Sequence, residues 1–382
     1  MSNTFLESYT QKVFTSLDND FEDNWDEFRF GGPDPVATQQ DNGMPFPHGL
    51  LNAVGLTTGG AARQKVGTCK EEISKALAFI APHISNLEWL YSNLADEESR
   101  QTLVDVIAFR ALGHSKIKIT INNPNYWAVR EKAFALPREG EEIDVGFLGW
   151  KLQKVSLEPF GYPIKILANK GANVTTFVHQ QYRCVTPNGA IECQVGDHVI
   201  DAGACYGDTA LYFSHLAGEF GRVASFEFLP QNLSVLKKNL DLNPTFAKTI
   251  QVYQNPVWVE SGKELFISGY GPGTRVTEEK ITHEADSVST LKIDDVVGTR
   301  EFPQVDFIKM DIEGAELQAL RGAEESIRRF KPKLAITVYH SLEDFWEIPQ
   351  WIAQLGLGYQ FYLRHFTIHQ EETVLFAKAA KK

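Results

Sequence analysis

The sequence contains few cysteines and methionines, and no apolar run is long enough to cross a bilayer. Its 382 residues include three methionines and four cysteines, which are Cys69, Cys184, Cys193 and Cys205. The cysteines form no close pair of the kind that holds structural zinc, and their low number predicts a reducing compartment. No signal peptide is recognisable either, so we expect a cytoplasmic protein without a membrane partner.

Positive charge is also scarce. Lysine and arginine number 37 against 49 aspartates and glutamates, for a net charge of −12, and no basic run exceeds a few residues. Proteins that bind nucleic acids neutralise phosphates with clustered lysine and arginine, so we expect no nucleic-acid partner. A chain of this length buries one large core and a smaller one.

A third absence concerns the turn after the apolar residues 198–200. The diphosphate-binding pattern G-x-G-x-x-G is incomplete, because Cys205 occupies the place of its second glycine. Asp201 ends the strand, Gly203 and Gly207 allow a ligand to approach the backbone, and a helix begins near Thr209. A carboxylate here disfavours a diphosphate and favours a cation, as in S-adenosylmethionine (SAM). An ordinary tight turn is the alternative.

Four more strands follow, and each leads to a polar residue. Residues 221–227, 250–253, 305–310 and 334–338 are largely apolar, which is typical of a parallel sheet covered on both faces. Ligands of such sheets bind outside the carboxyl ends of the strands. Glu227 suits the ribose hydroxyls and Asn255 an adenine edge. The residues expected on this rim are Asp201, Glu227, Asn255, Asp311 and His340.

The strand-like runs 359–365 and 373–377 predict a hairpin that closes the sheet. From about residue 174 to residue 377, the chain resembles the FkbM family of SAM-dependent methyltransferases. The matching stretches are 199–203, 207–213, 225–228, 306–316, 333–336, 339–340 and 372–376. Residues 94–113 also resemble the helical lead-in of longer members of the family.

The resemblance implies an α/β fold of the class I methyltransferase type, with a doubly wound, mostly parallel sheet and a C-terminal antiparallel hairpin. It also implies SAM as cofactor and methyl transfer, usually to a hydroxyl of a natural product or sugar. Two other hypotheses stay open. One is an NAD-dependent oxidoreductase on a Rossmann-like sheet, and the other is a SAM-binding scaffold protein without catalytic activity.

We expect three regions. Residues 1–70 form an irregular arm with short helices, residues 71–173 a helical and mixed accessory domain, and residues 174–382 the SAM-binding domain. The accessory domain serves as a lid, as a substrate contact or as the interface of a homo-oligomer. Within it, residues 164–168 are expected to pair with residues 181–185 in a small sheet.

The predicted site joins the rim to the glycine turn. The cofactor-binding residues are Asp201, Ala202, Gly203, Ala204, Gly207, Thr209, Glu227, Phe228, Asn255 and Asp311. His340 is the first candidate for a general base, since histidine titrates near neutrality, and a structural histidine is the alternative. Asp311 is either the base itself or the partner that orients His340.

The acceptor, a small molecule with a hydroxyl group, is expected to contact Glu313, Tyr339, Arg364 and His365. Asp311 and Glu313 are also spaced so that a divalent ion between them is an alternative, but we predict no metal. Glu316 is interpreted as a charge that complements the N-terminus of a helix.

Overall fold

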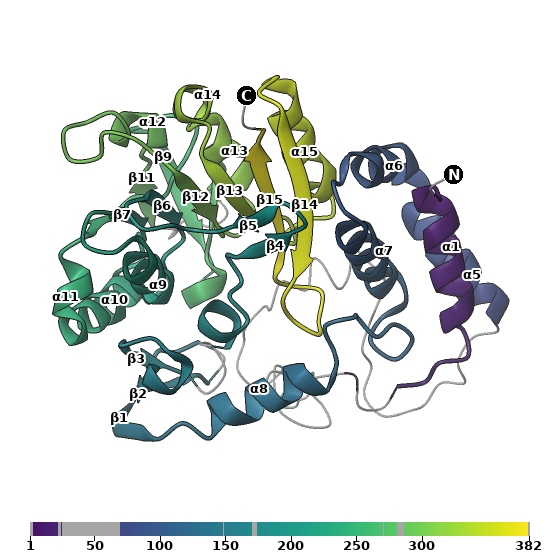
Figure 1. Cartoon of the computed structure of the whole chain (residues 1–382), viewed down its shortest axis with the longest axis horizontal. Helices are drawn as coiled ribbons and strands as arrows, with labels where there is room; N and C mark the ends of the chain where they lie inside the picture. Colours follow the sequence, from purple (N-terminus) through teal and green to yellow (C-terminus); the bar gives the residue numbers. More distant parts are fainter. Residues whose placement is uncertain are drawn as a thin grey trace. The chain divides into compact units, whose positions relative to one another are not determined.

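The computed structural model describes residues 3–21, 24, 69–147, 149–169, 174–269, 271–280 and 286–380. The chain divides into two compact units (Figure 1). One consists of Met1–Tyr126 with His365–Glu372, and the other of Trp127–Arg364 with Thr373–Lys382. The boundary that we predict after residue 173 falls inside the second unit. Most of the predicted arm lies outside the described residues, so the three-region division stays a prediction.

The first unit is helical. Its helices are α1 (Phe5–Ser16), α5 (Cys69–Ile80), α6 (Ile84–Asn93) and α7 (Glu97–Leu112), with the short turn η1 (Ala81–His83) after α5. Asp96 caps α7 by accepting a hydrogen bond from the Ser99 amide at 2.8 Å, and Gly113, with φ of 80°, ends it. Every residue from 103 to 112 is buried, as expected of a helix packed on several sides. Helices α5, α6 and α7 agree with the helical character expected at the start of residues 71–173.

The second unit is built on a seven-stranded sheet of order β14-β15-β13-β12-β6-β7-β8. Strands β8, β7, β6, β12 and β13 are parallel, and β15 runs antiparallel to β13. The predicted doubly wound, mostly parallel sheet is therefore confirmed. The strands are β6 (His198–Ala202), β7 (Arg222–Phe226), β8 (Ile250–Tyr253), β12 (Phe307–Met310), β13 (Lys333–Thr337), β14 (Tyr359–His365) and β15 (Thr373–Ala379).

Helices connect these strands, and α9 packs against β6 and β7. The residues of β6, β7, β12 and β13 are almost all buried, because their apolar side chains face covering layers on both sides, whereas β8 at the edge of the sheet is only partly buried. No helix of the described residues is both long and apolar enough to span a membrane. The helices are α8 (Pro124–Phe134), α9 (Asp208–Ala217), α10 (Pro230–Leu242), α11 (Pro244–Ala247), α12 (Ile293–Val296), α13 (Glu316–Arg321), α14 (Glu324–Phe330) and α15 (Asp344–Gln354).

Three small sheets have the orders β1-β2-β3, β4-β5 and β10-β9-β11. The predicted pairing of residues 164–168 with 181–185 is wrong, because β3 pairs with β2, and β4 pairs with β5 across a two-residue turn. In both cases the actual partner strand is closer in the sequence than the partner that we predicted. The remaining elements are β1 (Arg138–Asp144), β2 (Lys151–Ser156), β3 (Lys165–Ala168), β4 (Cys184–Thr186), β5 (Gly189–Ile191), β9 (Glu264–Ser268), β10 (Arg275–Thr277), β11 (Ser287–Ser289), η2 (Glu158–Phe160), η3 (Val174–Val178) and η4 (Gly271–Gly273).

Asn239 of α10 and Asn243, the residue that follows this helix, hydrogen-bond to the backbone of β3. Asn239 accepts from the Leu167 amide at 2.7 Å, and its own amide donates to the Leu167 carbonyl at 3.4 Å. Asn243 makes the same two contacts to Lys165, at 3.0 and 2.6 Å. The match has a geometric basis, since four residues of helix rise about 6 Å and two residues of strand about 6.6 Å. Asn239 also donates to the carbonyl of Tyr206 at 2.8 Å, which ties β3 to the turn after β6.

Candidate active site

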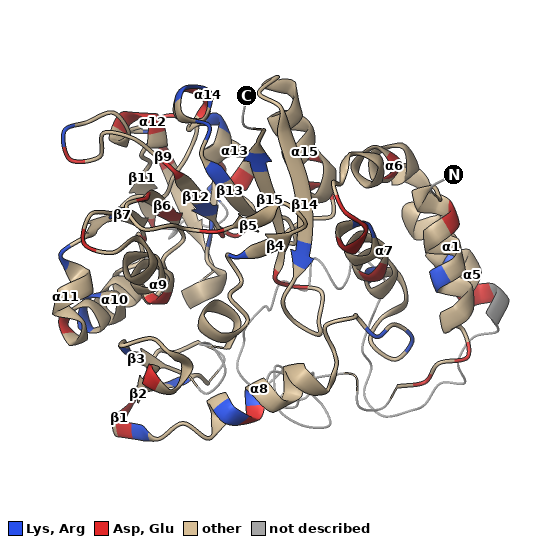
Figure 2. Cartoon of the chain, in the orientation of Figure 1, with Lys and Arg blue, Asp and Glu red and all other residues tan. Residues whose placement is uncertain are grey.

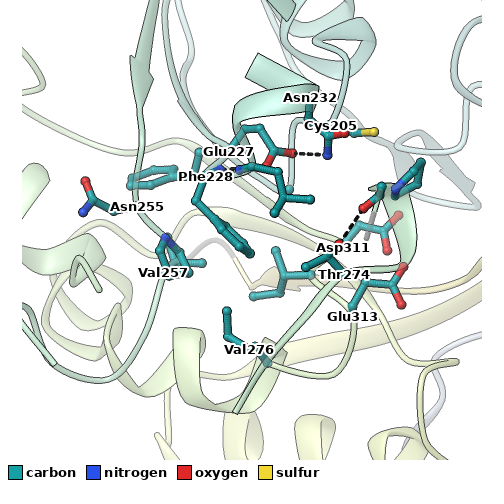
Figure 3. A pocket seen from close by; sticks show the side chains of 18 residues that line it. Cys205, Glu227, Phe228, Asn232, Asn255, Val257, Thr274, Val276, Asp311 and Glu313 are labelled. Atoms are coloured by element: carbon teal, nitrogen blue, oxygen red, sulfur yellow. Dashed lines mark hydrogen bonds between the residues drawn. The ribbon is translucent and has the colours of Figure 1, made fainter. Parts of the chain in front are cut away.

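A cleft of about 580 Å³, part of it open to solvent, lies at the carboxyl ends of the parallel strands. Of the five predicted rim residues, Glu227, Asn255 and Asp311 line it, whereas Asp201 and His340 do not. Figure 3 shows Asn255 on one side of this cleft and Asp311 with Glu313 on the other. The lining residues are Gly203, Cys205, Phe226, Glu227, Phe228, Leu229, Asn232, Asn255, Pro256, Val257, Gly271, Pro272, Thr274, Val276, Asp311, Ile312, Glu313 and Ala315.

The glycine turn between β6 and α9 is held by its neighbours. The amides of Gly203 and Ala204 both donate to the Phe226 carbonyl, at 3.1 and 3.0 Å. Gly203 has φ of +84°, and a Cβ atom there would lie 1.9 Å from the Asp311 carbonyl oxygen. Only glycine fits, because both the conformation and the space exclude a side chain. Two neighbouring strand ends therefore lie in direct backbone contact at the floor of the cleft.

Asp201 is buried beneath this turn. Its carboxylate accepts hydrogen bonds from the Thr209 hydroxyl at 2.9 Å and from the Ser225 hydroxyl at 3.4 Å. The positive group next to this carboxylate is a side chain of the same protein, since Lys309 Nζ lies 3.2 Å from Asp201 Oδ1. The cleft is also not lined by Ala202, Ala204, Gly207 or Thr209. Of the cofactor-binding residues predicted between positions 201 and 209, only Gly203 lines the cleft.

Lys309 is a functional residue that the sequence analysis missed. It comes from β12, where it pairs in register with Asp201, and Nζ donates to the carbonyls of Ala202 at 3.0 Å and Gly203 at 2.6 Å. Burial lowers the pKa of Lys309, but the carboxylates of Asp201 and Asp311 outweigh that effect, and the net pKa is raised. A charged amine therefore fixes the turn from below. The available signal was a lysine inside an otherwise apolar strand.

Glu227 lies at the end of β7 and faces the cleft. Its Oε1 accepts from the amides of Phe228 and Leu229, at 2.7 and 2.8 Å, and its Oε2 accepts from the Asn232 side chain at 3.1 Å (Figure 3). Burial raises the pKa of Glu227 although these hydrogen bonds oppose the shift. The carboxylate is thus fixed in place while Oε2 retains room for further donors.

The Asn255 end of the cleft is mostly apolar. The Asn255 amide donates to the Ser289 carbonyl at 2.8 Å, which anchors this residue to β11. The walls come from Phe228, Pro256 and Val257, and from Val276 of β10. Such walls suit a flat aromatic group.

The opposite end is acidic. Tyr339 donates to Asp311 Oδ1 at 3.1 Å and Tyr182 to Oδ2 at 3.3 Å, so two hydroxyl groups orient this carboxylate. Glu313 follows in the left-handed region with φ of 58°, a conformation that costs a non-glycine residue about 1–3 kcal/mol. This strained turn directs the chain after β12 along the cleft.

His340 lies behind Asp311, with only 3% of its side chain exposed. Its Nε2 is 3.5 Å from Asp311 Oδ1 and 3.7 Å from Glu313 Oε2, and its Nδ1 is 3.0 Å from Glu316 Oε1. Burial lowers the pKa of His340, but the carboxylates of Glu316 and Glu313 outweigh it, and the pKa ends well above its usual value. A raised pKa makes the neutral form of the histidine, which accepts a proton, scarcer, so this setting differs from the one we predicted. Glu316 is the first residue of α13, at the helix N-terminus where we expected it, and it is fully buried.

The comparisons with known proteins agree with this geometry. Residues 201–361 match the family model of the methyltransferase FkbM domain. Residues 201–361 carry the FkbM methyltransferase domain. The match begins at Asp201 and ends within β14, so it includes the glycine turn, the cleft and His340, and it confirms the resemblance proposed from the sequence.

Solved structures that are similar to this chain include methyltransferase FkbM from Methylobacillus flagellatus KT. It is 22% identical, with 93% of this chain and 72% of that chain covered and a TM-score of 0.50. Fibrillarin from Aeropyrum pernix, solved with bound SAM, is 14% identical over 64% of this chain and 97% of its own, with a TM-score of 0.32. A search of curated proteins found no match.

Two of the residues predicted to contact the acceptor of this FkbM domain lie elsewhere. The Arg364 guanidinium donates to the carbonyls of Leu363 and Val185, both at 2.9 Å, and Arg364 does not line the cleft. His365 belongs to the first unit, where Nε2 lies 2.7 Å from the His369 carbonyl oxygen and burial lowers its pKa to about 4. Both side chains contact backbone carbonyls near the end of β14. The other two predicted residues are at the site, since Glu313 lines the cleft and Tyr339 donates a hydrogen bond to Asp311.

Proposed function

We propose that the protein transfers the methyl group of SAM to a hydroxyl group of a small natural product or sugar. The observation that carries this proposal is the charge of the cleft. Among the residues that the structure describes, its lining includes Glu227, Asp311 and Glu313 but no lysine, arginine or histidine. Such a lining repels the diphosphate of NAD, whereas SAM brings a sulfonium and an ammonium group that carboxylates attract.

Glu227 is the residue that we assign to the ribose. An acid at the end of the second strand accepts hydrogen bonds from ribose hydroxyls in nucleotide-binding sheets of this type. The adenine then lies against Phe228, Pro256 and Val257, with Asn255 at its edge. Gly203 and Asp311 are left for the sulfonium end, where the methyl group leaves.

Asp311 is our candidate for the group that accepts the proton of the acceptor hydroxyl. It lines the cleft with 20% of its side chain exposed, whereas His340 is enclosed behind it. Transfer from SAM is an in-line displacement that depends mainly on placement of the two reactants. A positioned base adds about 100- to 10,000-fold. Glu313 and Tyr339 complete the acceptor end.

Calorimetric titration of the full chain with SAM, S-adenosylhomocysteine and NAD tests the cofactor. We expect the first two to bind and NAD not to bind, and the reverse would overturn the assignment. Incubation with methyl-labelled SAM and a panel of alcohols, sugars and amines then tests the acceptor by mass spectrometry. Label on amines alone would contradict the hydroxyl acceptor, and SAM binding without any transfer would favour the scaffold protein.

We further propose that the protein acts in the cytoplasm on small molecules, without nucleic acid or membrane partners. The net charge of −12 supports this, and Figure 2 shows lysine and arginine dispersed over many elements. The free cysteines Cys184, Cys193 and Cys205 suit a reducing compartment. The homo-oligomer stays an expectation, and light scattering that gives a monomer mass would overturn it.

A further inference from the structure

The imidazole of His340 is enclosed by acids at the end of the cleft. Glu316 Oε1 lies 3.0 Å from Nδ1, and Asp311 Oδ1 lies 3.5 Å from Nε2. Taken as whole residues, His340 is 6% exposed to solvent and Glu316 is fully buried. With Glu313 3.7 Å away, three carboxylates surround one imidazole, which leaves an excess of negative charge even when the imidazole carries a proton.

Several polar atoms of this cluster lack a hydrogen bond within the described part of the chain. They are both ring nitrogens of His340 and Oε2 of Glu316, although the two nitrogens lie 3.0 Å from Glu316 Oε1 and 3.5 Å from Asp311 Oδ1. Buried polar atoms without a hydrogen bond are uncommon in folded proteins, so three of them in one cluster indicate that the site takes up a further group. All three belong to residue types that bind metal ions.

The carboxylates themselves are held in orientation by neighbours. Glu316 Oε1 accepts from the Ile312 amide at 2.9 Å and from the Thr337 hydroxyl at 3.1 Å. Asp311 is oriented by the hydroxyls of Tyr339 and Tyr182. Donors of this kind surround the ligands of established metal sites, where they fix ligand orientation.

The spacing also fits an ion. One ligand atom from each of Asp311, Glu316 and His340 lies within 4.8 Å of the other two. Ligands bonded to zinc at about 2.0–2.2 Å are separated from one another by roughly 3–3.5 Å, so the three residues must move closer together to bind one ion, which contacts a single ring nitrogen of His340. Of the three residues, Asp311 lines the cleft.

We propose that Asp311, Glu316 and His340 bind a divalent transition-metal ion such as Zn²⁺ or Mn²⁺. The imidazole disfavours Mg²⁺ and Ca²⁺, which prefer oxygen ligands alone. This inference deepens the proposed function, because an ion here lies at the acceptor end and lowers the pKa of a bound hydroxyl. Asp311 has two carboxylate oxygens, so one can bind the ion while the other accepts the proton.

The test begins with full-length protein freed of metal by a chelator and then dialysed. Calorimetric titration with Zn²⁺ and with Mn²⁺, checked by metal analysis, is expected to give one bound ion per chain, and Mg²⁺ is expected to bind at least tenfold more weakly. Glu316→Gln and His340→Asn should each weaken binding tenfold or more. Glu347→Gln, an exposed change of the same kind on α15, should leave affinity unchanged.

Absence of binding by the unmodified chain would overturn the proposal, and so would full affinity in Glu316→Gln. Asp311→Asn provides a variant of the partly exposed ligand, and circular dichroism of each variant establishes that it is folded. SAM titration of the metal-free protein separates the two proposals. SAM binding without metal binding removes only the ion site, whereas metal binding without SAM binding removes only the proposed function.

Discussion

Asp201 and Asp311 differ in environment although both were expected on the same rim. Asp201 is sealed beneath the glycine turn with Lys309, whereas Asp311 lines the cleft. The register of β6 and β12 explains this, since Asp201 pairs with Lys309 and Ala202 with Met310. Asp311 is therefore level with Gly203, two residues beyond Asp201. An acidic residue near the end of a strand therefore reaches the cleft only if the adjacent strands of the sheet end at the same level.

The largest effect that we expect separates the two acids by activity. Asp311→Asn should lower methyl transfer about 100- to 10,000-fold, because the proton acceptor is lost, while SAM affinity stays nearly unchanged. Steady-state kinetics with saturating SAM measure it. Glu347→Gln serves as the control, and full activity of Asp311→Asn would assign the base elsewhere.

The second effect separates the acids by stability. Asp201→Asn leaves the charge of Lys309 buried without its partner and should reduce the free energy of unfolding by about 3–5 kcal/mol. Urea unfolding measures this, and the double variant Asp201→Asn with Lys309→Met should recover part of the loss. If Asp201→Asn instead lost SAM affinity at full stability, Asp201 would contact the cofactor as the sequence suggested.

A smaller effect concerns Glu227, the third acid of the rim. Glu227→Gln should weaken SAM binding roughly ten- to hundredfold, since hydrogen bonds to a charged group contribute about 1.5–3 kcal/mol. Calorimetry measures the change, and turnover at saturating SAM should remain close to that of the unmodified protein. An equal loss of turnover would place Glu227 in the chemical step.

The smallest effect is on pH dependence. Because burial raises the pKa of Glu227, this carboxylate takes up a proton at a higher pH than an ordinary glutamate. SAM affinity should therefore decline a few-fold as the pH falls through the mildly acidic range, since the protonated form accepts ribose hydroxyls less well. Titrations at several pH values measure it, and Glu227→Gln should flatten the profile. A decline that persists in this variant would have another cause.

Much of the sheet could be predicted, because apolar strands followed by acids or glycines are local patterns. The glycine turn, Glu227, Asn255 and Asp311 were placed at strand ends for this reason. Lys309 could not be assigned its role, since that depends on the register between β6 and β12, which no local pattern encodes. The burial of His340 among three acids likewise requires the packing of α13 against the sheet.

Arg364 and His365 show a second limit. Their residue types suggest an acceptor, but their hydrogen bonds to backbone carbonyls are decided by how β14 ends and where its connection returns. The pairing of β3 failed for a similar reason. Short strands without strong alternation have several possible partners, and the nearest in sequence has the smallest loop-closure entropy.

Asn239 and Asn243 have one more consequence. They hydrogen-bond to the backbone of Lys165 and Leu167, which are alternate residues of β3. They therefore occupy backbone groups at the edge of β3 to which a strand of another chain could otherwise bind. An open edge is where sheets of separate molecules join, and a helix here fills that place with two amide groups. The β1–β2 hairpin can therefore vary in length or composition without exposing this edge to edge-to-edge aggregation.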